Sequence, residues 1–344
     1  MGHAKLEPIN EEGGNGMLAL NILDYSPIDE GATARDALLQ TIELAKLAEE
    51  AGYRRFWVAE HHKVASVAGS TPELLMMQLA ASTLKIRVGS GGVMLPHYSA
   101  YKVAENFRML EALHPNRIDL GIGRSRSYQA VNKAMNSMRE RAVSYEEQLD
   151  DLKSYFMDVN ELPAMPIIST IPELWLLGTG EGSAGLAAEK GMAYSYAHFA
   201  RPSLDGLAII KKYRRDFSAS PFLQQPKVMI AVFAVVGETA EQAEELAKAF
   251  DLWLLFVESN NPPPYYPSVE TAKLRGFSAS EQQKVQENRK RMIIGNADFV
   301  KTEIERIADL YGADEITVIP NIAGAENRMN SIRLLAEAFG LENE

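Results

Sequence analysis

Short, mostly apolar runs alternate with longer amphipathic stretches along the chain from residue 18 onward. Each run has the length of a strand, and its apolar residues are consecutive, which is typical of strands buried on both faces. The eight strands predicted in this way are Leu18–Leu23, Arg55–Ala59, Ile86–Val93, Arg117–Ile122, Glu173–Gly178, Ala193–Tyr196, Val228–Val236 and Glu315–Ile319.

The stretches between these runs carry apolar residues at helical spacing. The helices predicted from this spacing are Ala34–Glu50, Pro72–Thr83, Ala100–Leu113, Arg139–Phe156, Ser203–Phe217, Ala240–Phe256 and Phe299–Leu310. Strands separated by helices indicate βαβ units and a parallel sheet. Eight such units favour closure, so we predict a single TIM-type (β/α)8 barrel over residues 17–344.

Two segments interrupt the alternation and are predicted to be functional loops. The first is Arg124–Met138, which follows the fourth strand, and the second is Glu258–Ser280, which contains three consecutive prolines. In a barrel, the loops that follow the strands form the active face. We therefore expect Glu258–Ser280 to be an inserted, lid-like loop. Residues 1–16 show no periodicity and are interpreted as a mobile tail or an expression remnant.

Composition narrows the range of partners. The chain has 344 residues with 46% hydrophobic and 24% charged residues, which suffices for a large core. Its net charge of −11 argues against binding to nucleic acid or to an anionic membrane. The absence of cysteine excludes disulfides and thiolate metal sites. With neither a membrane-length apolar run nor a leader pattern, we expect a soluble, cytoplasmic protein.

The second predicted strand ends in Glu60-His61-His62, which places two imidazoles on the catalytic face of a barrel. One interpretation is structural, with one packed and one solvated histidine. A zinc site is a weaker alternative, because adjacent side chains on a strand point apart and no third ligand has metal spacing. We therefore predict no metal site.

The stretch from Leu177 to Ser183 follows a strand and opens a helix, with glycines at 178, 180 and 182. Backbone N–H groups at such a helix start can bind a phosphate, and Thr179 and Ser183 add hydroxyl donors. The glycine spacing differs from the dinucleotide fingerprint, which favours a mononucleotide phosphate over a pyrophosphate. A purely structural turn with a helix cap is the alternative.

Two further features point to the same face. Arg124 ends the fourth strand, where a guanidinium could pair with a phosphate or with an anionic flavin ring; the alternative is a surface ion pair. The third strand carries glycines at 89, 91 and 92. Glycine inside a strand usually marks a bulge or the close approach of a ligand, so we expect a flat group to lie against it.

Taken in this order, the segments resemble the bacterial luciferase-like monooxygenases, a family of FMN-dependent oxidoreductases. The resemblance extends over nearly the whole chain after the tail. The matching stretches are Val58–His62, Gly89–Pro96, Ala104-Glu105, Leu110, Asn116–Arg124, Leu177–Gly191, Gly295–Val300, Gly312–Ile316 and Ser331–Ala336.

The resemblance implies a (β/α)8 barrel, a flavin cofactor and a homodimer. It implies that Arg124, the backbone amides of Thr179 and Gly180, and the Ser183 hydroxyl hold the FMN phosphate. Arg141 is implied as a further phosphate partner.

The resemblance also assigns residues around the flavin ring. Ser90-Gly91 falls at the position of a non-proline cis peptide that lies against the isoalloxazine ring. His61 matches the active-site histidine, a general base or proton donor. His198 falls where an aromatic ring or imidazole packs along the cofactor.

The activity implied by the resemblance is a two-component monooxygenase. Reduced FMN would arrive from a separate NAD(P)H:flavin reductase, and O2 would supply one oxygen atom to a small organic substrate. Two alternatives remain open. One is deazaflavin-dependent hydride transfer on the same barrel, and the other is a non-catalytic flavin-binding protein.

Overall fold

A computed structural model describes residues 18–137, 142–200, 202, 204–259 and 261–341. The tail predicted at residues 1–16 lies outside the described residues. The described strands are β1 (Ala19–Asp24), β2 (Arg55–Val58), β3 (Arg87–Met94), β4 (Ile118–Gly123), β5 (Glu173–Gly178), β6 (Ala193–Ala197), β7 (Val228–Gly237), β8 (Met292–Asn296) and β9 (Glu315–Ile319).

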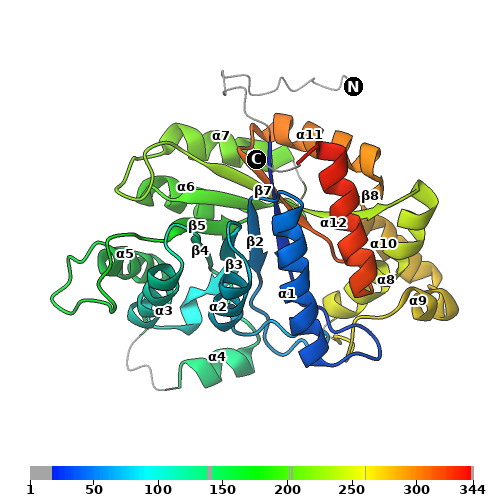
Figure 1. Ribbon diagram of the computed structural model, residues 1–344, viewed down its shortest axis with the longest axis horizontal. Helices are drawn as coiled ribbons and strands as arrows, with labels where there is room; N and C mark the ends of the chain where they lie inside the picture. The colour runs from blue at the N-terminus through cyan, green and yellow to red at the C-terminus, as the bar shows by residue number, and fades with distance from the viewer. Residues whose placement is uncertain (1–17, 138–141, 201, 203, 260, 342–344) are drawn as a thin grey trace.

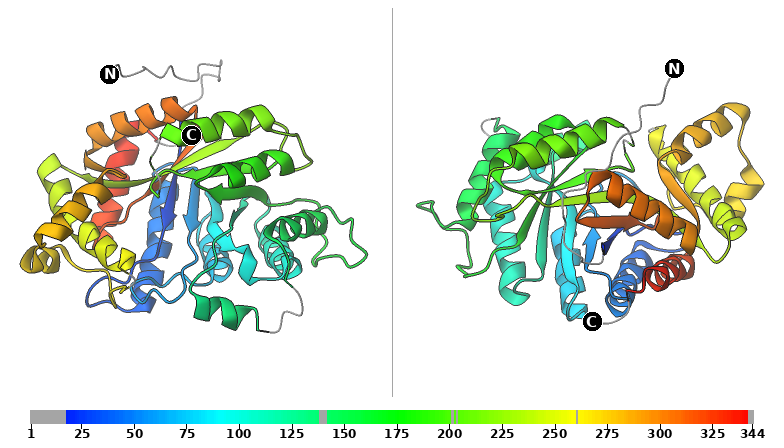
Figure 2. Two further views of the ribbon diagram at one scale, coloured as in Figure 1. Left: turned by 180° about the vertical axis from the view of Figure 1, so that it is seen from behind. Right: turned by 90° about the horizontal axis from the view of Figure 1, so that it is seen from above.

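The helices surround the strands (Figures 1 and 2). They are α1 (Ala34–Glu50), α2 (Pro72–Ser82), α3 (Ala100–Leu113), α4 (Gln129–Met135), α5 (Tyr145–Phe156), α6 (Glu181–Lys190), α7 (Leu204–Asp216), α8 (Ala240–Glu258), α9 (Val269–Arg275), α10 (Ala279–Arg289), α11 (Ala297–Tyr311) and α12 (Ala325–Phe339), with a short 3-10 helix at Leu95–His97. Of these, α4, α9, α10 and α12 were not predicted, and α5 begins at Tyr145, whereas the predicted helix began at Arg139, which lies outside the described residues.

The eight predicted strands close into a parallel barrel in the order β1 to β7, then β9, which returns to β1. This confirms the predicted (β/α)8 fold. β8 is an addition outside the ring. It pairs with the second half of the long strand β7, whereas β9 pairs with the first half.

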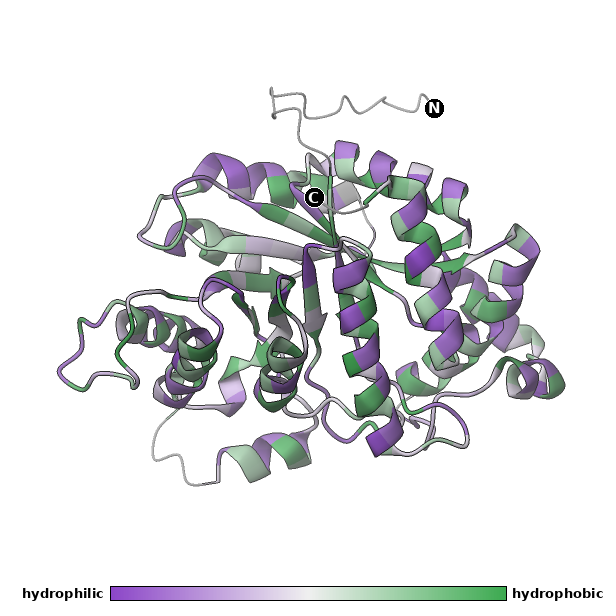
Figure 3. Ribbon diagram, viewed as in Figure 1, coloured by the Kyte–Doolittle hydropathy of each residue, from purple (hydrophilic) through white to green (hydrophobic). Residues whose placement is uncertain are grey.

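Each strand is apolar on both faces because it packs against two different layers. On β2, Trp57 belongs to the cluster inside the barrel, and its neighbours Phe56 and Val58 pack against the helices. Figure 3 shows the same arrangement, with green strands at the centre and helices that are purple on their outer faces. The same alternation determines which site residues on the strands face the barrel interior.

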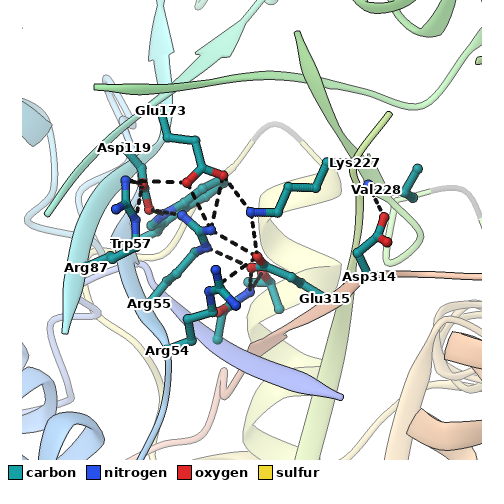
Figure 4. Close-up of polar contacts among 12 residues, drawn as sticks. Arg54, Arg55, Trp57, Arg87, Asp119, Glu173, Lys227, Val228, Asp314 and Glu315 are labelled. Carbon is teal, nitrogen blue, oxygen red and sulfur yellow. Dashed lines mark hydrogen bonds and ion pairs between the residues drawn. The ribbon is translucent and has the colours of Figure 1, made fainter. Parts of the chain in front are cut away.

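Charged residues close the amino-terminal end of the barrel (Figure 4). The fully buried Arg55 forms ion pairs with Asp119 at 2.8 Å, with Glu315 at 2.7 Å and with Glu173 at 3.1 Å. Lys227 bridges Glu173 and Glu315 at 2.7 and 3.0 Å. These residues lie at or next to the first residue of five different strands. The network therefore links the strands at the end of the barrel opposite to the proposed site.

The segment Glu258–Ser280 is not the irregular loop that the sequence predicted. Its second half forms α9 and the N-cap of α10, and Tyr266 is fully buried. The backbone of Tyr266 donates to the Ile28 carbonyl at 2.6 Å and accepts from Glu30 N–H at 2.9 Å. The prolines prevent a continuous helix, but these bonds fix the segment to the loop after β1. The segment is therefore an ordered part of the fold, and its role as a lid stays a prediction.

The other irregular segment, Arg124–Met138, contains the short helix α4, which stands apart from the helix layer (Figure 1). No residue of α4 itself is buried. The preceding turn is held by a hydrogen bond from Ser127 N–H to His97 Nε2 at 3.1 Å and by Lys63 lying 5.2 Å from the ring centre of Tyr128.

Candidate functional site

A pocket of about 630 Å³ opens at the carboxyl ends of β4, β5 and β6. It lies beside the start of α6, and its lining is largely the set predicted to bind phosphate. The lining residues are Gly123, Arg124, Ser125, Leu177, Gly178, Thr179, Gly180, Gly182, Ser183, Ala197 and Ala200. The structure therefore brings the predicted arginine and the glycine-rich turn together in one cavity.

The turn between β5 and α6 presents the start of a helix to this pocket. Gly180 is the N-cap in extended backbone, and it has no side chain that could occupy the N–H groups of the first turn. A Cβ atom on Gly180 would meet nothing within 4 Å, whereas one on Gly182 would lie 3.7 Å from Arg124 Nη1. The guanidinium thus lies next to the positive end of α6, and the pair forms an anion-binding cradle.

The hydroxyl of Ser183 is hydrogen-bonded to other groups of the protein. Its Oγ donates to the Gly180 carbonyl at 2.9 Å and lies 3.1 Å from the Tyr194 hydroxyl. Burial raises the pKa of Tyr194 to about 12, so its phenol keeps a proton to donate. Tyr194 therefore supports Ser183, a role that the sequence analysis missed.

The glycines of β3 form a narrow floor inside the barrel. A Cβ on Gly91 would lie 2.7 Å from the Leu23 side chain, and one on Gly92 would lie 2.3 Å from that of Leu177. Both glycines are half-exposed, so the backbone itself is the surface here. A flat group can lie against such a surface.

The position of the non-proline cis peptide differs from the prediction. The cis bond joins Gly91 and Gly92, one residue later than the predicted Ser90-Gly91. The pairing of β3 with β4 shifts between Ser90 and Val93. Ser90 comes before this irregularity, and its hydroxyl donates to the Gly121 carbonyl at 2.9 Å and accepts from the Gly121 N–H at 3.1 Å. Its buried side chain joins two strands instead of facing the cavity.

His61 continues the inward face of β2. Trp57 and Ala59 point into the barrel, and strand alternation carries the same direction to residue 61. Glu60 and His62 point the other way and bond to each other, with His62 Nε2 at 2.6 Å from Glu60 Oε1. The ring of His61 packs on Tyr25, which contacts the cluster inside the barrel, whereas His62 is held by Glu60.

The environment of His61 keeps its imidazole neutral. Burial, with a smaller contribution from His62, lowers the pKa of His61 to about 4. Its Nδ1 is buried and makes no hydrogen bond to any described residue. The ring centre lies 4.8 Å from that of Tyr25, at 64° between the planes. A neutral imidazole next to an aromatic ring can accept a proton at pH 7.

His198 does not reach the pocket. The alternation on β6 turns Tyr194, Tyr196 and His198 toward the helices, and His198 Nδ1 lies 3.1 Å from the Tyr311 hydroxyl. His198 therefore contacts Tyr311 instead of lying along the cofactor as predicted. Phe199 faces inward instead and packs on Phe233 with ring centres 4.6 Å apart.

Arg141, the remaining predicted phosphate partner, lies outside the described residues. Among the residues that the structure covers, no three His, Asp or Glu side chains are placed to hold a metal ion. In the same part of the chain, no helix is long and apolar enough to cross a membrane. Tyr25 and Tyr194, which contact His61 and Ser183, were not identified from the sequence, and neither was Phe199, which precedes the pocket residue Ala200.

Comparison of the sequence with known proteins points to one family. The family model for luciferase-like monooxygenases matches residues 20–327. The uncharacterized protein YwcH of Bacillus subtilis (strain 168) is 44% identical, covering 94% of this chain and 99% of that protein. The N-acetyl-S-alkylcysteine monooxygenase of the same organism is 35% identical, covering 94% and 98%.

Solved structures agree with the fold. The crystal structure of apo-MsnO8 matches with a TM-score of 0.87 and 34% identity, covering 95% of this chain and all of that one. The oxygenating constituent of 3,6-diketocamphane monooxygenase in complex with FMN, from the CAM plasmid of Pseudomonas putida, matches with a TM-score of 0.69 at 16% identity, covering 94% and 98%. An F420-dependent secondary alcohol dehydrogenase matches with a TM-score of 0.66 at 14% identity, covering 96% and 100%. The last two show the fold alone.

Proposed function

The chain belongs to the luciferase-like monooxygenase family, and from this membership we propose that it uses reduced FMN and O2 to oxygenate a small organic substrate. The observation that carries the proposal is the cradle formed by Arg124 and the start of α6, which lies at the same barrel end as the glycine floor of β3. Such a cradle suits one phosphate group, and the floor suits one flat ring.

In this proposal the chain holds FMN in two places. Arg124 pairs with the phosphate, and the backbone amides at Thr179 and Gly180 donate to it. The Ser183 hydroxyl joins them by turning from the Gly180 carbonyl, to which it donates in the protein without flavin. The ring rests near Gly91 and Gly92, where any side chain would clash with Leu23 or Leu177. The bound reduced flavin would supply electrons to oxygen, which is the chemistry that the protein cannot perform itself.

His61 is the proposed acid–base group of the site. It faces the barrel interior in its neutral form, so at neutral pH it can accept a proton from a substrate or donate one after protonation. Tyr25 and Phe199 add apolar surface around the same end of the barrel. This surface excludes water and favours a substrate with an uncharged, apolar part.

The deazaflavin alternative is separated from FMN by the cofactor itself. Neighbours of this fold use FMN or F420, so the fold alone does not choose. One phosphate site suits either cofactor, so we favour FMN because the family model that matches the chain is that of the luciferase-like monooxygenases. A non-catalytic flavin carrier would have no need for a neutral imidazole in the loop after β2.

We further propose partners and a location. Reduced FMN would come from a separate NAD(P)H:flavin reductase in the cytoplasm. A second copy of the chain would cover Met109 and Leu113, which lie one turn apart on α3 and are 50% and 59% exposed. Large apolar side chains exposed together mark an interface more often than a free surface.

The proposed function is tested by anaerobic titration followed by one turnover. Protein is titrated with reduced FMN and with reduced F420, mixed with oxygenated buffer, and analysed for hydrogen peroxide and for substrate that carries ¹⁸O from ¹⁸O₂. An S-alkyl thioether is the first substrate to test, given the name of the 35% identical relative. Binding of FMN with ¹⁸O in a product supports the proposal; hydride transfer with F420, or FMN binding with peroxide as the sole product for every substrate, overturns it.

A further inference from the structure

Tyr25 and His61 form an edge-on pair at the carboxyl ends of two neighbouring strands. Tyr25 directly follows β1, and His61 lies three residues past the end of β2. Their ring centres are 4.8 Å apart with 64° between the planes. Aromatic rings prefer this T-shaped arrangement, which orients the second ring as well as shielding it.

The backbone around this pair is unusually well fixed for two loops. Ala68 N–H donates to the Ser26 carbonyl at 2.9 Å, and Ile28 N–H donates to the Ser66 carbonyl at 2.8 Å. An antiparallel bridge joins Pro27 and Val67 between these two bonds. The loop after β1 is thereby paired with the loop after β2, which holds the two rings in register.

The loop after β2 also bonds to the backbone of His61 and to helix α8. His61 N–H donates to the Gly69 carbonyl at 2.8 Å, within the paired loop. On the other side, Trp253 of α8 donates from Nε1 to Ser66 Oγ at 3.0 Å. Helix α8, which precedes the segment predicted to be a lid, therefore contacts the loop that holds the backbone of His61.

We propose that Tyr25 is a positioning residue that fixes the ring of His61 and keeps water from its Nδ1 side. The importance of this role for the reaction rests on the proposed function, because only there does His61 transfer protons. The contact itself is a property of the protein without flavin and can be measured there.

The titratable groups next to His61 are His62 and Tyr25. From its own strand end, His62 acts on it and disfavours its charged form. From the loop after β1, the facing titratable group is Tyr25, whose pKa burial raises, so it remains uncharged. Desolvation is therefore the main cause of the lowered pKa of His61. The ring of Tyr25 is in close contact with the imidazole and covers part of it.

The experiment follows the histidine resonances of ¹³C,¹⁵N-histidine-labelled, flavin-free protein by NMR between pH 4 and 8. In Tyr25→Ala, water should reach the imidazole, so the midpoint of His61 should rise by about one pH unit or more toward the ordinary value near 6.5. Tyr25→Phe keeps the ring and should keep the midpoint. Phe199→Ala removes another aromatic ring, one that packs on Phe233, and should also leave His61 unchanged.

An unchanged His61 midpoint in Tyr25→Ala overturns the proposal, provided that the melting curve shows a folded protein. An equal rise in Tyr25→Phe also overturns it, because the ring is then not the cause. If Tyr25→Ala fails to fold, Tyr25→Leu gives the same comparison with a non-aromatic side chain of moderate size. Failure of the proposed monooxygenase activity would leave these NMR outcomes intact, so the two hypotheses are tested separately.

Discussion

A Cβ atom on Gly178 would lie 2.0 Å from Ser183 Oγ and 2.5 Å from Ser183 Cβ. The end of β5 and the first turn of α6 therefore touch at a point where only glycine fits. This contact holds the start of α6, with its N–H groups, at the edge of the proposed phosphate pocket.

We expect Gly178→Ala to weaken FMN binding by tenfold or more, because the first turn of α6 must move to admit the methyl group. Riboflavin, which lacks the phosphate, should lose much less affinity. Fluorescence titration measures both ligands. Gly185→Ala is the matched control on the same helix, since a Cβ there meets nothing within 4 Å; its affinity for FMN should be unchanged and its melting temperature equal or higher. Equal losses for FMN and riboflavin in Gly178→Ala would contradict the phosphate assignment.

Arg124→Ala should weaken FMN binding by about 1.5–3 kcal/mol, which is the usual contribution of a charge-assisted hydrogen bond. The expected dependence on the phosphate again makes riboflavin the comparison ligand. Arg124→Lys should recover part of the affinity, because it keeps the charge and loses the fork of donors. If riboflavin loses as much affinity as FMN, Arg124 serves the ring or the fold and not the phosphate.

His61→Ala should slow oxygenation by roughly 10²- to 10⁴-fold with nearly unchanged FMN affinity, as expected for a positioned acid or base. Rapid mixing of the reduced complex with oxygen measures the rate, and His62→Ala is the control, because His62 faces away and pairs with Glu60. Two silent variants would remove His61 from the mechanism.

The pH dependence of the same step follows from the lowered pKa of His61, about 4. The neutral imidazole predominates above that value, so a step in which it accepts a proton should stay flat from pH 5 to pH 8. The rate should fall only as the pH drops through about 4. An inflection near 6.5 would indicate an ordinary solvated histidine and would contradict the environment described for His61.

The buried charge network predicts an acid-sensitive barrel. Burial raises the pKa of Glu315, but Arg55, Lys227 and Arg54 outweigh it and lower the value to about 2. A depressed carboxyl pKa stabilises the fold above the unfolded value near 4.5, and this stabilisation is lost as the pH falls from 4.5 through 2. Glu315→Gln should cost about 3–5 kcal/mol at pH 7, because it leaves a buried guanidinium underpaired.

Urea unfolding of Glu315→Gln and wild type at pH 7 and pH 3.5 measures this effect, and the difference between them should shrink at the lower pH. Glu303→Gln is the surface control: Glu303 pairs with Arg306 at 2.8 Å on α11, where such a pair contributes at most about 1 kcal/mol. Similar losses for both variants would mean that the network at the barrel base adds nothing particular.

The proposed dimer predicts that Leu113→Glu shifts the protein to a monomer in light scattering coupled to size exclusion. A charge placed in an apolar interface must be desolvated without a partner. Leu274→Glu, at an 89% exposed leucine on α9, should leave the mass unchanged. A wild-type protein that is already monomeric at micromolar concentration contradicts the proposed interface.

The sequence by itself determined the barrel. Consecutive apolar residues in strand-length runs require two covering layers, and eight such runs joined by helices leave a closed parallel ring as the natural solution. The sequence also located the strand-to-helix turn at Gly178–Ser183 and the arginine at the end of β4. These features are local, because a strand, a turn and a helix start are each encoded within a few neighbouring residues.

What the sequence left undecided depended on contacts across the fold. Arg55 pairs with Glu315 across 260 positions, and Tyr25 meets His61 only because β1 and β2 are adjacent in the ring. The segment Glu258–Ser280 contains enough proline to suggest a loose loop, yet the backbone hydrogen bond from Tyr266 to Ile28 holds it in place. His198 is a suitable residue at a suitable position, but strand alternation turns it toward Tyr311 on α11. Residue type and spacing identify candidates, whereas side-chain direction and neighbours follow from the closed barrel, since residues far apart in sequence become neighbours only after the strands have paired.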